Sequence, residues 1–183
     1  MHKLLKWSGV TLIVLVLATV GVILNEFRTT STFELIVVYM DEENPEAIRW
    51  GAEQALYVFH PAQEDVKRLN REAGARYAAS LSDTREAESV LRHLVANGLD
   101  INSVDEVDGS GFTALHAAVL SNDHSAVKVL LKEGADPGVT DREGRTPLEL
   151  ADVIARNRPD RDFGRVIQLL EQAEDDTDEA GAG

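Results

Sequence analysis

The sequence contains no cysteine, and this absence excludes several classes of site at once. A chain without thiols has no disulfide framework, no thiolate zinc site and no cysteine nucleophile. It also has no cysteine that a lipid can modify, which excludes a lipoprotein anchor. The 183 residues, of which 44% are hydrophobic, are enough for one ordinary domain with a folded core.

Basic residues are also scarce. All 32 Asp and Glu residues lie after residue 24, where only 16 Lys and Arg remain, so this part carries a formal net charge of −16. A surface of this sign repels phosphate backbones, which argues against nucleic acid as a partner. The same charge steers a basic protein toward the chain.

The N-terminal segment has the features of a membrane anchor. Residues 7–24 carry no charge and follow a basic n-region, residues 1–6, that includes Lys3 and Lys6. As a helix, this segment covers about 27 Å, close to the ~30 Å of a hydrocarbon core. The two lysines favour a cytoplasmic N-terminus. We therefore expect a single-pass signal anchor in the inner (plasma) membrane, with the body periplasmic or extracytoplasmic. A cleaved signal peptide is the alternative, because Thr19 and Gly21 form a small-residue pair.

Beyond the anchor, short patterns recur at a spacing of more than 30 residues. An apolar triplet at helical spacing precedes a glycine twice, 36 residues apart: Leu91, Leu94 and Val95 before Gly98, and Val127, Leu130 and Leu131 before Gly134. Residues 108–115 (DGSGFTAL) match residues 141–148 (DREGRTPL) at an offset of 33 residues. A period of this length, made of a turn and two short helices, predicts a stacked solenoid.

These residues resemble the ankyrin repeat family. The pattern Asp-x-x-Gly-x-Thr-x-Leu-His-x-Ala occupies residues 108–118. The next copy departs from the pattern, because Glu149 takes the histidine position and six residues are inserted around 156–162. The resemblance implies an all-α, ankyrin-like helical solenoid of about four helix pairs over residues 46–174, preceded by the transmembrane helix.

The flanking segments are less regular. Residues 46–73 are expected to form a helix pair, and residues 87–102 a second helix with its exit loop. Residues 25–45 are expected to be a linker with an N-terminal capping segment. Within them, residues 33–40 (FELIVVYM) are rich in β-branched and aromatic side chains, so they are interpreted either as this cap or as a partner-binding strand. Residues 175–183 are expected to be a disordered acidic tail.

His116 stands in an apolar run, where an imidazole serves as a metal ligand, a catalytic base or scaffolding. Thr113 is expected at the N-cap, with its hydroxyl accepting from the His116 N–H. In the next copy Thr146 and Glu149 form a capping box. We therefore interpret these four residues, with Gly134, as structural repeat positions. The other histidines lack paired ligand spacing and no catalytic motif is found, so no metal, cofactor or catalytic site is predicted.

The loops between repeats are the candidate protein-binding surface, because such repeats are known chiefly as protein-binding scaffolds. The candidate residues are Asp105, Glu106 and Asp108 in the first loop and Asp141, Arg142, Glu143 and Arg145 in the second. For any single one of them, the alternative is a solvated turn residue. The inserted loop around 156–162 is a second candidate.

The resemblance implies a non-enzymatic protein-binding module. Ankyrin-like proteins are found among bacterial immunity proteins, so one hypothesis is an immunity-type protein that binds and neutralises a toxin or effector enzyme, basic or membrane-acting. The alternative is a periplasmic scaffold or stabiliser of a cell-envelope enzyme. A hydrolase with carboxylate catalysis is a further alternative.

Overall fold

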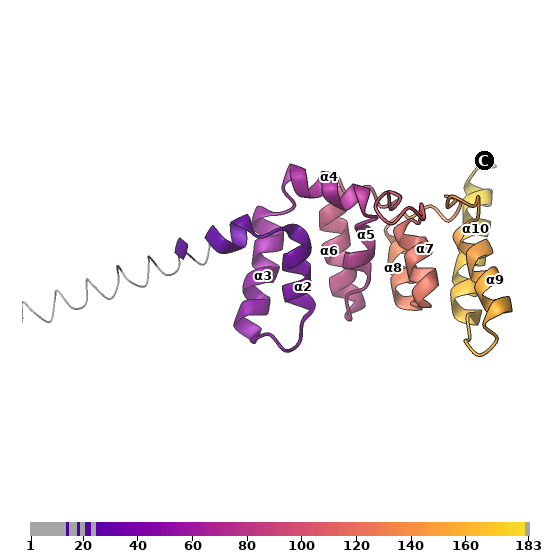
Figure 1. Cartoon of the computed structure of the whole chain (residues 1–183), viewed down its shortest axis with the longest axis horizontal. Coiled ribbons are helices and arrows are strands. Elements are labelled where there is room, and N and C mark those ends of the chain that lie inside the picture. Colours follow the sequence, from indigo (N-terminus) through magenta and orange to yellow (C-terminus); the bar gives the residue numbers. More distant parts are fainter. Residues whose placement is uncertain (1–13, 15–17, 19–20, 23–24, 182–183) are drawn as a thin grey trace, which may run out of the picture. The chain divides into compact units, whose positions relative to one another are not determined.

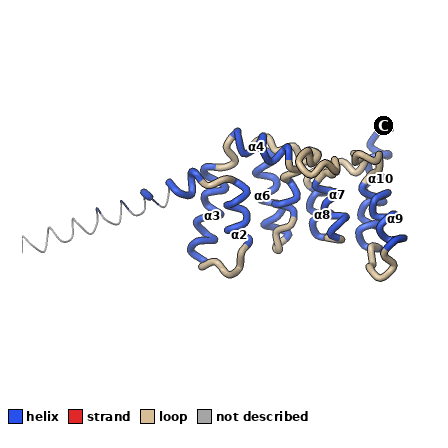
Figure 2. Tube along the Cα trace, in the orientation of Figure 1, coloured by secondary structure: helices blue, strands red, loops and turns tan. Residues whose placement is uncertain are grey.

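The computed structural model describes residues 14, 18, 21–22 and 25–181, which are drawn in colour in Figure 1. This part of the chain divides into two units, one that ends at His60 and one that begins at Pro61. The basic n-region and most of the predicted membrane segment 7–24 lie outside the described residues. Among those that are described, no helix is both long and apolar enough to cross a membrane. Their regular elements are helices joined by loops (Figure 2).

The first unit contains α2 (Thr32–Met40), which is helical in spite of its β-branched residues. A capping box starts the helix: Ser31 Oγ accepts from the Glu34 N–H at 3.3 Å, and Glu34 Oε2 accepts from the Ser31 N–H at 3.1 Å. Three large side chains on one face are then buried, which outweighs the intrinsic β-propensity: Leu35, Ile36 and Tyr39. The interpretation of residues 33–40 as a strand is therefore wrong.

The partner of α2 is α3 (Glu46–Phe59), and the two form a hairpin. The buried face of α3 consists of small and aliphatic residues: Ala52, Ala55 and Leu56. Sequence spacing predicts that residues 46–73 form one helix pair, and this prediction is wrong. α4 (Gln63–Arg71) belongs to the second unit, because the unit boundary follows His60 and the apolar face of α3 is already covered by α2.

In the second unit, three helix pairs stand side by side (Figure 1). They are α5 (Ala75–Ala79) with α6 (Thr84–Ala96), α7 (Ala114–Ser121) with α8 (His124–Lys132), and α9 (Pro147–Asn157) with α10 (Gly164–Gly181). The first helices contact one another in the order α5, α7, α9, and the second helices in the order α6, α8, α10. Each pair therefore buries its apolar residues against the next pair, as expected for a solenoid.

Helices α6 and α8 end in the same way, which explains the two glycines 36 residues apart. After α6, Gly98 has a φ of +103°, and the Leu99 N–H donates to the Leu94 carbonyl at 3.0 Å. After α8, Gly134 has a φ of +97°, and the corresponding bond measures 2.9 Å. This hydrogen-bond pattern is the Schellman motif, whose left-handed residue is favourable mainly for glycine. The two turns send the chain into the loops that carry the candidate residues.

The last helix is longer than the sequence predicts. α10 continues through residues 175–181, where a disordered acidic tail is expected. Its first turns are fixed by burial of Val166 and Leu170. Once these turns are packed, adding further residues does not require a new helix nucleus, and no proline interrupts residues 171–181. The prediction of disorder is therefore wrong for 175–181, and residues 182–183 lie outside the described part.

Candidate protein-binding surface

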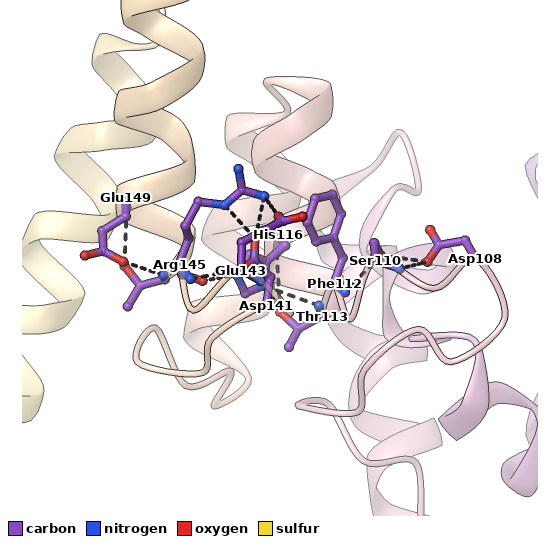
Figure 3. Close-up of polar contacts among 10 residues, drawn as sticks. Asp108, Ser110, Phe112, Thr113, His116, Asp141, Glu143, Arg145 and Glu149 are labelled. Atoms are coloured by element: carbon purple, nitrogen blue, oxygen red, sulfur yellow. Dashed lines mark hydrogen bonds and ion pairs between the residues drawn. The ribbon is translucent and has the colours of Figure 1, made fainter.

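Thr113 and His116 form a capping box at the N-terminus of α7 (Figure 3). Thr113 Oγ1 accepts from the His116 N–H, and His116 Nδ1 accepts from the Thr113 N–H, both at 3.3 Å. The opposite ring nitrogen, Nε2, donates to the carbonyl oxygen of Arg145 in the next loop at 3.0 Å. The ring also stacks on Phe112, with 5.5 Å between the centroids. The histidine thus joins two successive repeats and holds both of their turns.

The same contacts fix the protonation state of His116. Its side chain has no exposed surface. This burial lowers the pKa of His116, because the imidazolium form would lose its hydration. A neutral ring with its proton on Nε2 satisfies all of these hydrogen bonds, since Nδ1 is then free to accept. These contacts give His116 a structural role at the junction of two repeats.

The second finger, residues 140–146, is organised by Asp141. This carboxylate is 6% exposed and accepts from the backbone N–H groups of Glu143 and Arg145, both at 2.9 Å. The Arg145 Nε–H also donates to it at 2.8 Å. Burial alone would raise the pKa of Asp141, but the hydrogen bonds from Arg145 outweigh it and lower the pKa. Arg145 contacts Glu143 as well, so both side chains are engaged within the finger.

The capping box predicted after this finger is present. Glu149 Oε2 accepts from the Thr146 N–H at 2.9 Å, and Thr146 Oγ1 accepts from the Glu149 N–H at 3.2 Å. Pro147 occupies the first helical position of α9. Glu149 therefore supplies the same N3 acceptor that His116 supplies in the preceding repeat.

The first finger, residues 104–113, is organised by Asp105. This carboxylate is 2% exposed and forms an ion pair of 2.9 Å with Arg76 Nη1 on α5. It also accepts from the backbone N–H groups of Val107 at 2.8 Å and Asp108 at 3.0 Å. Sequence spacing places Asp105 and Asp141 among the candidate binding residues. In the structure both are buried, so they hold the fingers from inside and do not present carboxylates to a partner.

The first finger contains three residues that the second lacks. Asp105 stands eight residues before Thr113, whereas Asp141 stands five residues before Thr146. The additional residues form the tip: Glu106, Val107 and Asp108. A second local turn supports this tip, because Asp108 Oδ1 accepts from the Ser110 N–H at 2.8 Å and from the Ser110 Oγ–H at 2.6 Å. These hydrogen bonds from Ser110 lower the pKa of Asp108.

The finger tips are exposed. In the first finger, 61% of the Glu106 side chain and 67% of Val107 are accessible, and Asp108 is exposed. In the second finger, Arg142 is exposed and Glu143 is 65% exposed at its side chain. Val107 is not among the residues predicted from the sequence, since a valine in an acidic turn gives no pattern signal.

The two fingers touch each other. The Arg142 N–H donates to the Ser110 carbonyl at 3.2 Å. The Arg142 side chain also lies over Gly111, where an added Cβ would approach Arg142 Cγ to 2.8 Å. Gly111 has a φ of +71°, so both its conformation and its space favour glycine. The structure therefore joins the two predicted loops into one surface.

The inserted loop between α9 and α10 has an internal role. Arg161 Nη2 donates to the Ser121 carbonyl at 3.2 Å, and Asn122 Nδ2 donates to the Asp162 carbonyl at 2.9 Å. The Arg161 guanidinium also lies over the Phe163 ring at 5.1 Å. The insertion thus packs against the turn of the preceding pair, and Arg161 is used for that contact.

A separate groove lies between α8 and α10, with a volume of about 540 Å³. Lys128 and Lys132 line one wall and Asp176 the other. The groove carries charges of both signs, and Gly134 is the one lining residue among the structural and binding positions predicted from the sequence. In the described part of the chain, including this groove, no group of three or more His, Asp or Glu residues is arranged to hold a metal ion.

A family model described as ankyrin repeats (three copies) matches residues 76–154. Residues 76–154 of the chain are ankyrin repeats. Modules of this family are typically non-catalytic and generally bind proteins. The match begins within α5 and ends within α9, so it includes both fingers.

Three relatives show the extent of the similarity. The chain is 32% identical over 120 residues to the putative ankyrin repeat protein YahD of Escherichia coli, which is 63% of this chain and 54% of that protein. It is 41% identical over 75 residues to human ankyrin repeat domain-containing protein 40, or 41% of this chain and 19% of that protein. It is 49% identical over 49 residues to mouse protein phosphatase 1 regulatory subunit 27, or 27% of this chain and 32% of that protein. The chain thus spans about half or less of the length of these relatives.

Proposed function

We propose that this chain is a membrane-tethered ankyrin-repeat module whose two finger tips bind a partner protein outside the cytoplasm. One observation carries the proposal: the bases of the fingers are held by buried carboxylates, while the tips are exposed. Asp105 and Asp141 each accept two backbone N–H groups of their own finger and pair with an arginine. A loop ordered in this way loses little conformational entropy on binding, which favours affinity.

The chemistry of the tips suggests the kind of partner. Val107 is an exposed apolar side chain between two acidic residues, Glu106 and Asp108. An apolar contact in the middle of a binding site, surrounded by charges, suits a partner with an apolar depression bordered by Lys or Arg. The net negative charge of the chain would steer such a basic partner toward this surface.

The proposed tether adds to binding without a new contact. A signal anchor at residues 7–24 would confine the module to a thin layer at the membrane. This confinement raises its effective concentration toward a partner that reaches the same membrane. The anchor and the export of the body rest on the uncharged segment and on Lys3 and Lys6, which precede it.

The specific role that we propose is immunity, in which the module binds and neutralises a basic or membrane-acting toxin or effector enzyme. The acidic tip and the predicted extracytoplasmic position both support this role. A module that instead serves as a periplasmic scaffold or stabiliser of a cell-envelope enzyme would use the same surface. Genetics separates the two, because loss of an immunity protein is harmful only when its toxin is present.

The decisive variant is a deletion of residues 106–108. After the deletion, Asp105 stands five residues before Thr113, the same spacing as Asp141 and Thr146 in the second finger. The shortened finger should therefore fold like its neighbour while lacking the proposed tip. We expect the variant to keep wild-type helix content and thermal stability but to lose the partner.

The partner is identified by photo-crosslinking from Val107 in the full-length protein in its membrane. The matched control places the crosslinker at Lys128 on α8, in the groove away from the fingers. A protein captured at Val107 and absent at Lys128 should bind the deletion variant at least ten times more weakly. If that protein binds the deletion variant as tightly as the wild type, the fingers are not the binding surface. If it is not toxic when produced alone, the immunity role is wrong.

A further inference from the structure

The first unit holds the end of its hairpin against the segment that follows the predicted anchor. Residues 25–29 are helical, and His60 Nε2 lies 3.2 Å from the carbonyl oxygen of Phe27. The Phe27 ring lies over Gly51 on α3, where an added Cβ would approach its Cε2 to 2.9 Å. On its other side His60 Nδ1 lies 3.3 Å from Thr32 Oγ1, at the start of α2. His60, directly after α3, is thus held beside the Phe27 backbone, while the Phe27 ring lies over Gly51 in the middle of the helix.

The position of Phe27 in the chain limits its distance from a bilayer. Phe27 is the third residue after residue 24, the end of the predicted membrane segment, and three residue steps span at most about 11 Å in any conformation. The headgroup region on each side of the hydrocarbon core is about 5–7 Å thick. If residues 7–24 cross the membrane, the hydrogen bond between Phe27 and His60 therefore keeps the end of α3 in or beside the headgroup region.

The hairpin is also polarised along its length. At the end away from residues 25–29 (Figure 1), the turn between α2 and α3 carries four carboxylates: Asp41, Glu42, Glu43 and Glu46. At the end beside Phe27, residues 54–62 contain no Asp, Glu, Lys or Arg. The nearby segment 25–29 has one charge of each sign, Glu26 and Arg28. Glu26 is thus the one acidic residue in these two segments, and the four carboxylates of the turn lie at the opposite end, where anionic headgroups would not repel them.

The uncharged end exposes apolar side chains. Val58 is 67% exposed, and Tyr57 and Phe59 are each 39% exposed. Tyr and other amphipathic aromatic residues favour the membrane interface, where one part of the ring is apolar and the other hydrated. Exposed apolar residues occur near the other end as well, including Ile48 at 43%, but there they stand among the acidic residues of the turn.

We propose that the C-terminal turn of α3, with Tyr57, Val58 and Phe59, lies in the membrane interface and sets the first unit against the bilayer. This inference rests on the proposed anchor at residues 7–24 and extends it. The contact would restrict the motion of the first unit relative to the anchor, so the connection between them would not act as a flexible linker. The acidic turn Asp41–Glu46 would then point away from the membrane.

The test uses the absence of cysteine, because a single introduced thiol can be spin-labelled without background. The full-length protein is reconstituted in vesicles of phosphatidylethanolamine and phosphatidylglycerol. Labels are placed in separate variants, Val58→Cys, Phe59→Cys, Ile48→Cys and Val14→Cys. Power saturation measures the accessibility of each label to oxygen, which concentrates in lipid, and to a water-soluble nickel chelate. Ile48 is the matched control, since it is exposed on the same helix about 15 Å from Val58.

We expect a severalfold higher ratio of oxygen to nickel accessibility at Val58 and Phe59 than at Ile48, with the highest ratio at Val14. If Val14 is in lipid while Val58 and Phe59 match Ile48, the anchor stands and the interfacial contact is wrong. If Val58 and Phe59 are shielded from both reagents, a protein surface covers them and the proposal is likewise wrong. A water-exposed label at Val14 would overturn the anchor, and the contact with it. Circular dichroism of each labelled variant checks that the helices are retained.

Discussion

Asp105 offers the sharpest test of how the first finger is held together. Replacing it by alanine removes the acceptor for two backbone N–H groups and leaves the partly buried Arg76 without its partner. Removing one member of a buried pair typically costs about 3–5 kcal/mol. Arg76 retains 28% of its side-chain exposure and can recover part of its hydration. We therefore expect Asp105→Ala to lower the free energy of unfolding by about 3 kcal/mol, the lower end of that range.

Two further variants separate the contributions. Asp105→Asn keeps an oxygen that can accept from Val107 and Asp108 but loses the ion pair, so it should cost about 1–2 kcal/mol. Glu106→Ala is the control. Its ion pair with Arg71 is 3.6 Å long and 61–70% exposed, and surface pairs of this kind contribute at most about 1 kcal/mol.

The measurement is urea unfolding of the full-length protein in mild detergent, followed by far-ultraviolet circular dichroism. The three variants should rank Asp105→Ala, Asp105→Asn and Glu106→Ala in decreasing destabilisation, with unchanged m-values. A native stability of about 5–15 kcal/mol makes the largest of these shifts easy to resolve. If Asp105→Ala were as mild as Glu106→Ala, the carboxylate would not hold the finger, and the reasoning would be refuted.

Four further substitutions test the turns and caps by the same unfolding measurement. Gly74→Ala should lower the free energy of unfolding by about 2–3 kcal/mol, because the new Cβ would lie 2.7 Å from Leu69 Cβ. An unchanged urea midpoint would contradict so close an approach of Gly74 to Leu69. Ala73→Gly should stabilise by about 0.5 kcal/mol, since Ala73 has a φ of +47°, and a loss of stability would show that its buried methyl matters more. Thr146→Ala should cost about 1 kcal/mol through loss of the N-cap, whereas no cost would mean that Pro147 alone fixes the helix start. Because the pKa of His116 is lowered in the folded chain, the unfolded chain takes up a proton at a higher pH than the folded chain does, so the free energy of unfolding should fall as the pH drops below about 6.5. His116→Gln keeps an acceptor at N3, and its free energy of unfolding should depend less steeply on pH in this range. An equal pH dependence in the variant would exclude His116 as the source.

Features that depend on neighbours in the sequence could be predicted. The capping boxes Thr113–His116 and Thr146–Glu149 each join residues three apart, so the pattern contains both partners. The start of α2 has the same signature, Ser31 followed by Glu34, directly before an apolar run. That signal is present in the sequence, but the β-branched composition of residues 33–40 favours a strand. In this segment the capping box, which fixes the backbone geometry of a helix start, is better evidence for secondary structure than amino-acid composition, which mainly reflects burial.

Features that depend on distant residues could not be predicted in the same way. The buried role of Asp105 requires Arg76, 29 residues earlier on a five-residue helix whose motif is degenerate. Alignment of the two motifs equates Asp108 with Asp141, at an offset of 33, and so places Asp105 outside the pattern. The apolar triplets, however, repeat at an offset of 36, which is also the distance between Asp105 and Asp141. The change from 36 to 33 means that three residues are inserted between these two landmarks, and the structure places them directly after the buried acid. A difference between the spacing of the triplets and the spacing of the motifs therefore indicates residues inserted in the loop between them. In a solenoid, an insertion of this kind lies on the surface, where packing between repeats does not constrain the side chains.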